Sequence, residues 1–222
     1  MYLKVIEKSN SVNIYFLAIP IVIGILFGIL VSYDQNDPDS NVLSKKNLLD
    51  GASILGDPNA KITIVEFGDY QCTFCYKFHQ DILPILKNEY INSGKIKMVF
   101  KDFPLNGDES IIAGEATYCA EDQNRYWAYH NVLYENWAGE KTGWIKFTSL
   151  YQFARYADLD LHEFTDCLST HEHLDRVLEN ERYANKIGIN ATPTFLVFDD
   201  KKVIRIIGAQ PIDVFRQVIS EF

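Results

Sequence analysis

The chain begins with a long apolar stretch and only later shows the mixed pattern of a globular domain. Residues 14–31 carry no charged side chain, Lys4 and Lys8 precede them, and several aspartates follow. With about 1.5 Å of rise per residue, a helix over this stretch would reach about 27 Å, near the thickness of a bilayer core. The pattern predicts one transmembrane helix, with the basic N-terminus cytoplasmic and the remainder extracytoplasmic (periplasmic or extracellular). A cleaved signal peptide is the alternative, although its apolar region is usually shorter.

The rest of the chain divides into a short polar segment and one long domain. Residues 1–31 form the cytoplasmic stub and the membrane helix. Residues 32–52 are predicted to be a linker, because their start is crowded with Asp, Asn and Ser and cannot bury much apolar surface. Residues 53–222 are enough for one well-buried core.

Within that domain, short runs of β-branched and aromatic residues predict four strands. These runs are residues 61–67, 96–100, 194–198 and 203–207. Residues 72–90 instead place apolar side chains at three- and four-residue steps, which predicts a helix that Pro84 kinks. Residues 107–186 have a helical pattern throughout, and Pro211 suits the first turn of a last helix. The order is βαβ, a helical insertion, then ββα, so we expect one α/β domain.

Composition and charge narrow the possible functions. Apolar residues make up 47% of the chain and charged residues 23%, which is ordinary globular usage. The 21 basic and 30 acidic residues give a formal net charge of −9. An acidic chain gains nothing from the counterion release that drives nucleic-acid binding, so we expect no nucleic-acid partner.

The strongest chemical signal is the pair Cys72 and Cys75, separated by two residues at the point where a predicted strand gives way to a helix. A helix N-terminus offers free N–H groups and the positive end of the dipole, and both stabilise a thiolate. The thiolate is the reactive form of cysteine. Two such thiols can alternate between dithiol and disulfide by exchange with another protein.

Two other interpretations of this motif stay open. A purely structural disulfide would close only a very short loop and would stabilise little. A zinc site could use Cys72, Cys75 and His79, but a structural zinc ion needs four ligands and the sequence has no second C-x-x-C.

The surroundings of the motif resemble a known family. The stretches that carry the resemblance are Val65–Cys75 with Phe78, His79 and Pro84; Asn190–Phe195; Gly56–Ala60; and Ala120–Leu133. Together they resemble the DsbA-like thiol–disulfide oxidoreductases, in particular their membrane-anchored or secreted relatives. The resemblance implies a thioredoxin-like fold, in which helices flank a central β-sheet, with a helical subdomain inserted at about residues 107–186.

The resemblance also implies roles for single residues. Cys72 would be the exposed nucleophile and Cys75 the buried resolving thiol. Pro193 would follow a cis peptide bond and would place Thr192 beside the Cys72 sulfur, where its backbone could pair with an extended substrate. An ordinary trans turn is the alternative for Thr192 and Pro193. Glu66 would be a buried acid near Cys75 that handles its proton, unless it is only an exposed charge at the strand end.

Cys119 and Cys167 form a second pair inside the helical insertion. Unpaired thiols seldom persist outside the cytoplasm unless they are buried. Some members of the resembled family join these parts of the insertion by a disulfide, which predicts a structural bond here. Two separate buried cysteines that pack as small apolar groups are the alternative.

The expected function is therefore the formation or exchange of disulfides in cysteine-containing secreted or surface proteins, without a metal or cofactor. By resemblance, a quinone-coupled membrane partner would reoxidise the enzyme. Thr73 and Phe74 separate the cysteines, where the strongest oxidants of the family carry a His, so we expect a milder oxidant. The alternatives are a reductase or isomerase fed by a membrane donor, and a non-catalytic chaperone or binding module on the same fold.

Overall fold

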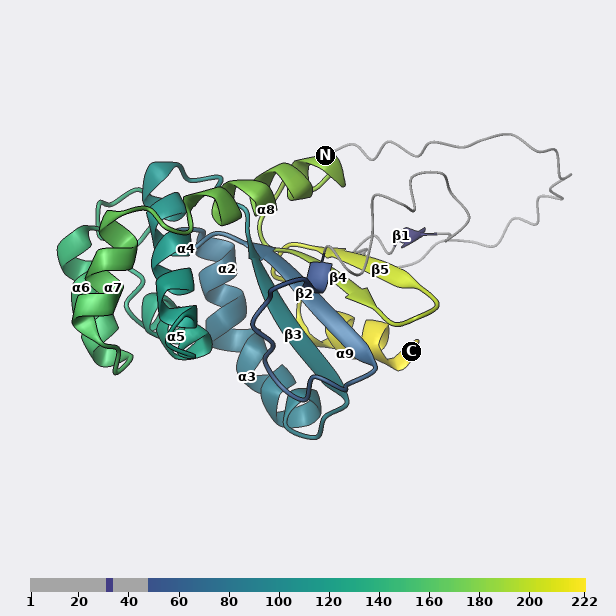
Figure 1. The fold of residues 1–222 in the computed structure, drawn as a ribbon. Helices are drawn as coiled ribbons and strands as arrows, with labels where there is room; N and C mark the ends of the chain where they lie inside the picture. The colour runs from purple at the N-terminus through teal and green to yellow at the C-terminus, as the bar shows by residue number, and fades with distance from the viewer. Residues whose placement is uncertain (1–30, 34–47) are drawn as a thin grey trace, which may run out of the picture.

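The computed structural model describes residues 31–33 and 48–222, and Figure 1 shows their arrangement. The predicted transmembrane helix at residues 14–31 lies outside the described residues except for Val31. None of the helices in the described part is both long and apolar enough to cross a membrane. The membrane anchor therefore stays a prediction.

The described strands form one mixed sheet in the order β1-β5-β4-β2-β3. Their bounds are Val31–Tyr33 for β1, Ile62–Gly68 for β2, Ile96–Asp102 for β3, Thr194–Phe198 for β4 and Val203–Ile207 for β5. Strands β2 and β3 run parallel, and the other neighbours run antiparallel. The last four strands agree with the predicted runs, and β1 falls where the sequence predicts the end of the membrane helix and the start of the linker.

The helices divide into those that cover the sheet and those that form the insertion. The active-site segment consists of α2 (Thr73–Lys77), η2 (Phe78–Ile82), α3 (Leu83–Leu86) and η3 (Lys87–Ile91). The insertion contains α4 (Asp108–Glu121), α5 (Tyr126–Glu135), α6 (Phe147–Tyr156), α7 (Leu161–Ser169) and α8 (Leu174–Lys186), and α9 (Ile212–Ser220) ends the domain. In Figure 1, α4 to α7 gather beyond one end of the sheet, and α8 returns from them towards it.

The active-site segment differs from the single kinked α-helix that its sequence predicts. Two π-helical stretches, η2 and η3, alternate with the α-helical ones. The N–H of Leu83 bonds to the carbonyl of Phe78, five residues back, immediately before Pro84. Because proline has no N–H to donate, the widened turn takes up the interruption that we predicted as a kink at Pro84.

The two faces of the sheet pack against different helices, and the alternation of β2 decides which side chain goes where. Ile62 and Ile64 pack in a core with Phe78 of the active-site segment and with α9. Val65 and Phe67, which point to the other face of the strand, pack in a separate core on the α8 side. Successive strand residues point to opposite faces, so Glu66 lies on the same face as Ile64, beneath the active-site helices.

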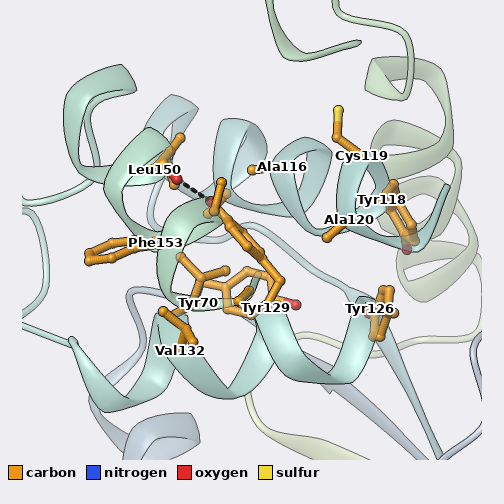
Figure 2. Packing of buried hydrophobic residues seen from close by; sticks show 14 of the residues in the cluster. Tyr70, Ala116, Tyr118, Cys119, Ala120, Tyr126, Tyr129, Val132, Leu150 and Phe153 are labelled. Carbon is orange, nitrogen blue, oxygen red and sulfur yellow. Dashed lines mark hydrogen bonds between the residues drawn. The ribbon is translucent and has the colours of Figure 1, made fainter. Parts of the chain in front are cut away.

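A third core joins the insertion to the active-site turn. Figure 2 shows Tyr70 and Tyr129 among the side chains of this core, and the hydroxyl of Tyr129 donates to the carbonyl of Leu150 over 3.1 Å. The same core contains Cys72 and Cys75. The insertion therefore forms one wall of the region that holds both cysteines.

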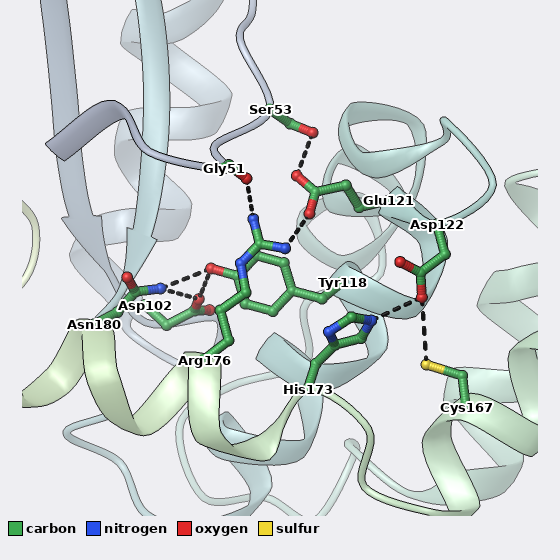
Figure 3. Close-up of polar contacts among 10 residues, drawn as sticks. All are labelled: Gly51, Ser53, Asp102, Tyr118, Glu121, Asp122, Cys167, His173, Arg176 and Asn180. Atoms are coloured by element: carbon green, nitrogen blue, oxygen red, sulfur yellow. Dashed lines mark hydrogen bonds and ion pairs between the residues drawn. The ribbon is translucent and has the colours of Figure 1, made fainter. Parts of the chain in front are cut away.

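The first described residues after the gap are tied to the insertion. In Figure 3, the guanidinium of Arg176 donates to the carbonyl of Gly51 and to the carboxylate of Glu121, which also accepts from the Ser53 hydroxyl. Leu48 is buried in the core on the α8 side of the sheet. Leu48 and Gly51 thus contact the domain, although they lie within the segment that the sequence predicts to be linker.

Candidate active site

Cys72 caps the N-terminus of α2, at the junction where the sequence predicts it. Its backbone is extended, and its sulfur accepts the N–H of Cys75 over 3.4 Å. Its thiol also donates to the carbonyl of Thr192 over 3.5 Å. The sequence predicts an exposed nucleophile, but Cys72 is only 5% exposed. It is buried because the Thr192 backbone lies against its sulfur.

The surroundings of Cys72 favour its thiolate. The hydrogen bond from the Cys75 side chain is the main cause that lowers the pKa of Cys72, which falls from 9.0 to about 7 although burial raises it. Hydrogen bonds from Thr192 and from the N–H groups of Cys75 and Phe74 also lower this pKa. Near neutral pH, about half of the Cys72 population is therefore the reactive form.

Cys75 has the opposite environment. It is fully buried, and burial raises its pKa well above 9.0, with the charges of Cys72 and Glu66 adding to the increase. A buried thiol of raised pKa holds its proton and is inert on its own. The pair thus consists of one activated sulfur near the surface and one protonated sulfur beneath it, and both are free thiols in this structure.

The Thr192–Pro193 peptide bond is cis, and the loop that contains it precedes β4. The loop lies 120 positions from Cys72 in the sequence, yet the carbonyl of Thr192 contacts the Cys72 sulfur. This is the placement that the resemblance implies for Thr192.

Glu66 is fully buried and pairs with His79 rather than lying exposed at the strand end. The distance from Glu66 Oε2 to His79 Nε2 is 3.0 Å, and Oε1 is buried without a hydrogen-bond partner among the described residues. Burial raises the pKa of Glu66 well above 4.5, and burial together with the charge of Lys87 lowers that of His79 to about 3. Both shifts favour the neutral forms of the two side chains, which a hydrogen bond joins.

The turn before Cys72 is anchored by residues that the sequence analysis does not single out. Asp69 accepts hydrogen bonds from the Gln71 N–H, the Ser110 hydroxyl and the Asn106 N–H. Ser110 in turn accepts from the Gln71 amide. Asp69 and Gln71 precede the motif directly, but their partner Ser110 is far away in the sequence, so no local pattern reveals the network.

The loop between α5 and α6 forms a second contact that the sequence does not reveal. The indole of Trp137 donates to the carbonyl of Gln71 over 3.0 Å and stacks on Tyr76 at 4.5 Å between ring centroids. The carboxylate of Glu140 accepts the N–H of Thr73 over 2.8 Å. This loop therefore places a negative charge at the residue that follows Cys72.

Cys119 and Cys167 are joined by a disulfide between α4 and α7. Cys167 also belongs, with Asp122 and His173, to the one group of three potential metal ligands in the described part of the chain. Because its sulfur is bonded to Cys119, Cys167 offers no thiolate to a metal. The zinc alternative for Cys72, Cys75 and His79 also finds no support, since His79 Nε2 is engaged by Glu66.

Comparisons with known proteins agree with this geometry. The family model described as thioredoxin matches residues 49–220. The chain belongs to the thioredoxin family. Among curated relatives, the probable disulfide bond formation protein D of Bacillus anthracis is 28% identical over 201 residues, covering 88% of this chain and 90% of the relative. The disulfide bond formation protein D of Bacillus subtilis is 27% identical over 78% of each chain.

Solved structures extend the comparison to the fold. The oxidised BdbD of Bacillus subtilis superposes with a TM-score of 0.70 at 27% identity, covering 77% of this chain and 92% of that one. The alpha-DsbA1 of Wolbachia pipientis gives 0.68 at 27% identity, covering 78% and 91%. The chain is thus a DsbA-like protein disulfide oxidoreductase with the predicted thioredoxin-like α/β fold.

Proposed function

We propose that this enzyme forms or exchanges disulfide bonds in secreted or surface proteins outside the cytoplasm, through Cys72 and Cys75. The observation that carries the proposal is the asymmetry of the pair, in which the Cys72 thiolate is stabilised and Cys75 is buried and protonated. The relatives are named disulfide bond formation proteins, which supports disulfide formation rather than reduction.

In the oxidising reaction, a substrate thiolate attacks the Cys72 sulfur of the Cys72–Cys75 disulfide. A mixed disulfide forms at Cys72, and Cys75 leaves as a thiolate that takes up a proton. A second thiolate of the substrate then attacks the substrate sulfur of the mixed disulfide and releases Cys72. The substrate loses two electrons and two protons, and the enzyme gains both as a dithiol.

The environment of Cys72 supports a mild rather than a strong oxidant. A pKa of about 7 lies at the upper end of the range for activated cysteines, well above about 3.5 for the most oxidising members. The less the thiolate is stabilised, the less the reduced form is favoured. We further propose that a membrane partner coupled to quinones restores the disulfide, and that residues 14–31 hold the enzyme beside it.

Catalysed oxidation of a reduced, unfolded protein tests the proposal. The 222-residue chain is incubated with reduced ribonuclease and oxidised glutathione, and the return of ribonuclease activity is followed. We expect the wild-type chain to speed this return and the Cys72→Ser variant to have no effect. If Cys72→Ser suppresses aggregation and helps refolding as well as the wild type does, the chain acts as a chaperone and the proposal is wrong.

A further inference from the structure

The pair of Glu66 and His79 joins the sheet beneath the active site to the wall of a cavity. Glu66 comes from β2 and points beneath the active-site helices, where its carboxylate, when ionised, acts electrostatically on Cys75. His79 comes from η2, one turn after Cys75, and its side chain is only 3% exposed. The two side chains meet at 3.0 Å, so they form a continuous polar contact through an apolar core.

His79 also lines a cavity. Its volume is 390 Å³, and its lining combines the end of the active-site segment with one side of α5. The lining includes His79 and Lys87 from the active-site segment and Tyr134 from α5. The wall is largely polar, and the cavity is large enough to hold several water molecules. His79 thus both contacts Glu66 and lines a polar cavity.

The reaction at Cys75 needs a proton that cannot easily come from solvent through the mouth of the site, which is the surface at Cys72 where the substrate binds. Cys75 is fully buried and leaves as a thiolate when a substrate sulfur bonds to Cys72. The substrate and the Thr192 backbone then cover Cys72, which is itself only 5% exposed. A route that avoids the mouth keeps proton transfer possible while the substrate is bound.

We propose that His79 relays protons between Glu66 and this cavity during disulfide exchange at Cys72. The inference rests on the proposed function. As Cys75 leaves, it takes the proton of the Glu66 carboxyl. The Nε2–H of His79 then reprotonates Glu66, while Nδ1 takes a proton from water of the cavity, and the hydroxide that remains is neutralised by the solvent buffer. A later move of the ring proton from Nδ1 to Nε2 restores the first tautomer. The reverse sequence removes a proton when the Cys72–Cys75 disulfide forms again.

The groups around His79 favour relay by the neutral ring. Tyr134 of α5 stacks on it at 4.0 Å between centroids, and His130 of the same helix lies at 4.7 Å. Lys87 of η3 lines the cavity and opposes a positive charge on the ring, as does burial. The relay therefore proceeds through the two neutral tautomers, and a side chain that cannot exchange one ring nitrogen for the other cannot replace His79.

The test measures a single turnover in the 222-residue chain. The oxidised enzyme is mixed with reduced glutathione, acid-quenched at intervals, and the appearance of the Cys75 thiol is followed by alkylation and mass spectrometry. His79→Gln keeps a hydrogen-bonding group beside Glu66, and His79→Ala opens the site to the cavity. His171→Ala is the matched control, because His171 pairs with buried Glu115 at 3.0 Å, away from Cys72.

We expect both His79 variants to slow the appearance of the Cys75 thiol at least about tenfold, as loss of a proton-transfer group does, with an unchanged alkylation midpoint for Cys72. Imidazole should restore the rate of His79→Ala, and 1-methylimidazole, which has no N–H, should not. His171→Ala should match the wild type.

Three results would overturn the relay. They are an unchanged rate in both folded His79 variants, equal rescue by the two imidazoles, and no rescue by either. A wild-type chain that does not exchange with glutathione at all would instead refute the proposed function.

Discussion

Removal of the Cys75 side chain should raise the pKa of Cys72 and reduce its reactivity. The hydrogen bond from Cys75 is the largest cause of the low pKa of Cys72, which is about 7 against an ordinary 9.0. In Cys75→Ala that hydrogen bond is lost while burial still opposes the thiolate, so the pKa should move most of the way to 9. Each pH unit corresponds to about 1.4 kcal/mol of lost thiolate stabilisation.

The change in reactivity follows from two opposing effects. At pH 7 the thiolate fraction falls from about one half to about one in a hundred, a decrease of about 50-fold. A more basic thiolate is a better nucleophile, by about six- to tenfold over two pH units. The net expectation is alkylation about five- to eightfold slower at pH 7 in Cys75→Ala than in the reduced wild type.

Alkylation of Cys72 by iodoacetamide, followed by mass spectrometry from pH 5 to 10, measures both quantities. Cys75→Ser is the matched control, because its hydroxyl can still donate to Cys72 and should keep the midpoint below that of Cys75→Ala. If the wild type and Cys75→Ala share one midpoint, or if the wild-type midpoint lies near 9, the account of Cys72 activation is refuted.

Four further predictions concern the stability of the fold and the pKa of Cys72. Replacing both Cys119 and Cys167 by Ala should lower the free energy of unfolding in urea by about 4 kcal/mol, because their disulfide closes a loop of 48 positions; a loss below about 1 kcal/mol would contradict this. Because Glu66 has a raised pKa in the folded state, it contributes stability that is complete below pH 4.5 and lost as pH rises. Relative to Glu66→Gln, the wild type should weaken by up to about 1.4 kcal/mol per pH unit above that value in urea titrations, and a pH-independent difference would be evidence against burial as the cause. Because the pKa of Cys72 is lower in the folded protein, the Cys72 thiolate stabilises the reduced fold at pH values above the unfolded pKa near 9. This stabilisation relative to Cys72→Ala should be lost as pH falls through 7. Thermal unfolding of the two proteins at pH 6 and pH 9 checks the difference. Glu140→Gln removes a negative charge from the Thr73 N–H and should lower the alkylation midpoint of Cys72 by a few tenths of a pH unit, whereas a rise would show that the carboxylate does not oppose the thiolate.

Local patterns in the sequence predict the features that depend on nearby residues. The β-branched run at Ile62–Gly68 and the apolar periodicity after Cys72 are each set by neighbours within a few positions. The position of Cys72 as a helix cap follows from the same junction. Only the resemblance to DsbA-like proteins implies the contact of Thr192 with Cys72, since 120 positions separate the two residues.

Features that depend on distant partners could not be predicted in this way. Glu140 bonds to Thr73 across 67 positions, and neither residue signals the other. The spacing of His79 from the two cysteines suggests a metal ligand and not a partner of Glu66, because spacing along a helix does not indicate which strand lies beneath it. The π-helical turns also escape prediction, because proline indicates an interruption but not whether the chain kinks or widens.

Redox equilibration of the 222-residue chain with glutathione tests the central claim most directly. The thiols are trapped at each ratio of reduced to oxidised glutathione and assigned by mass spectrometry. The account predicts one reversible two-electron transition confined to Cys72 and Cys75, with a potential between about −120 mV and about −200 mV. If no Cys72–Cys75 disulfide forms at any ratio, the claim that this pair exchanges disulfides is contradicted. A potential near about −270 mV would contradict the oxidising direction of the reaction.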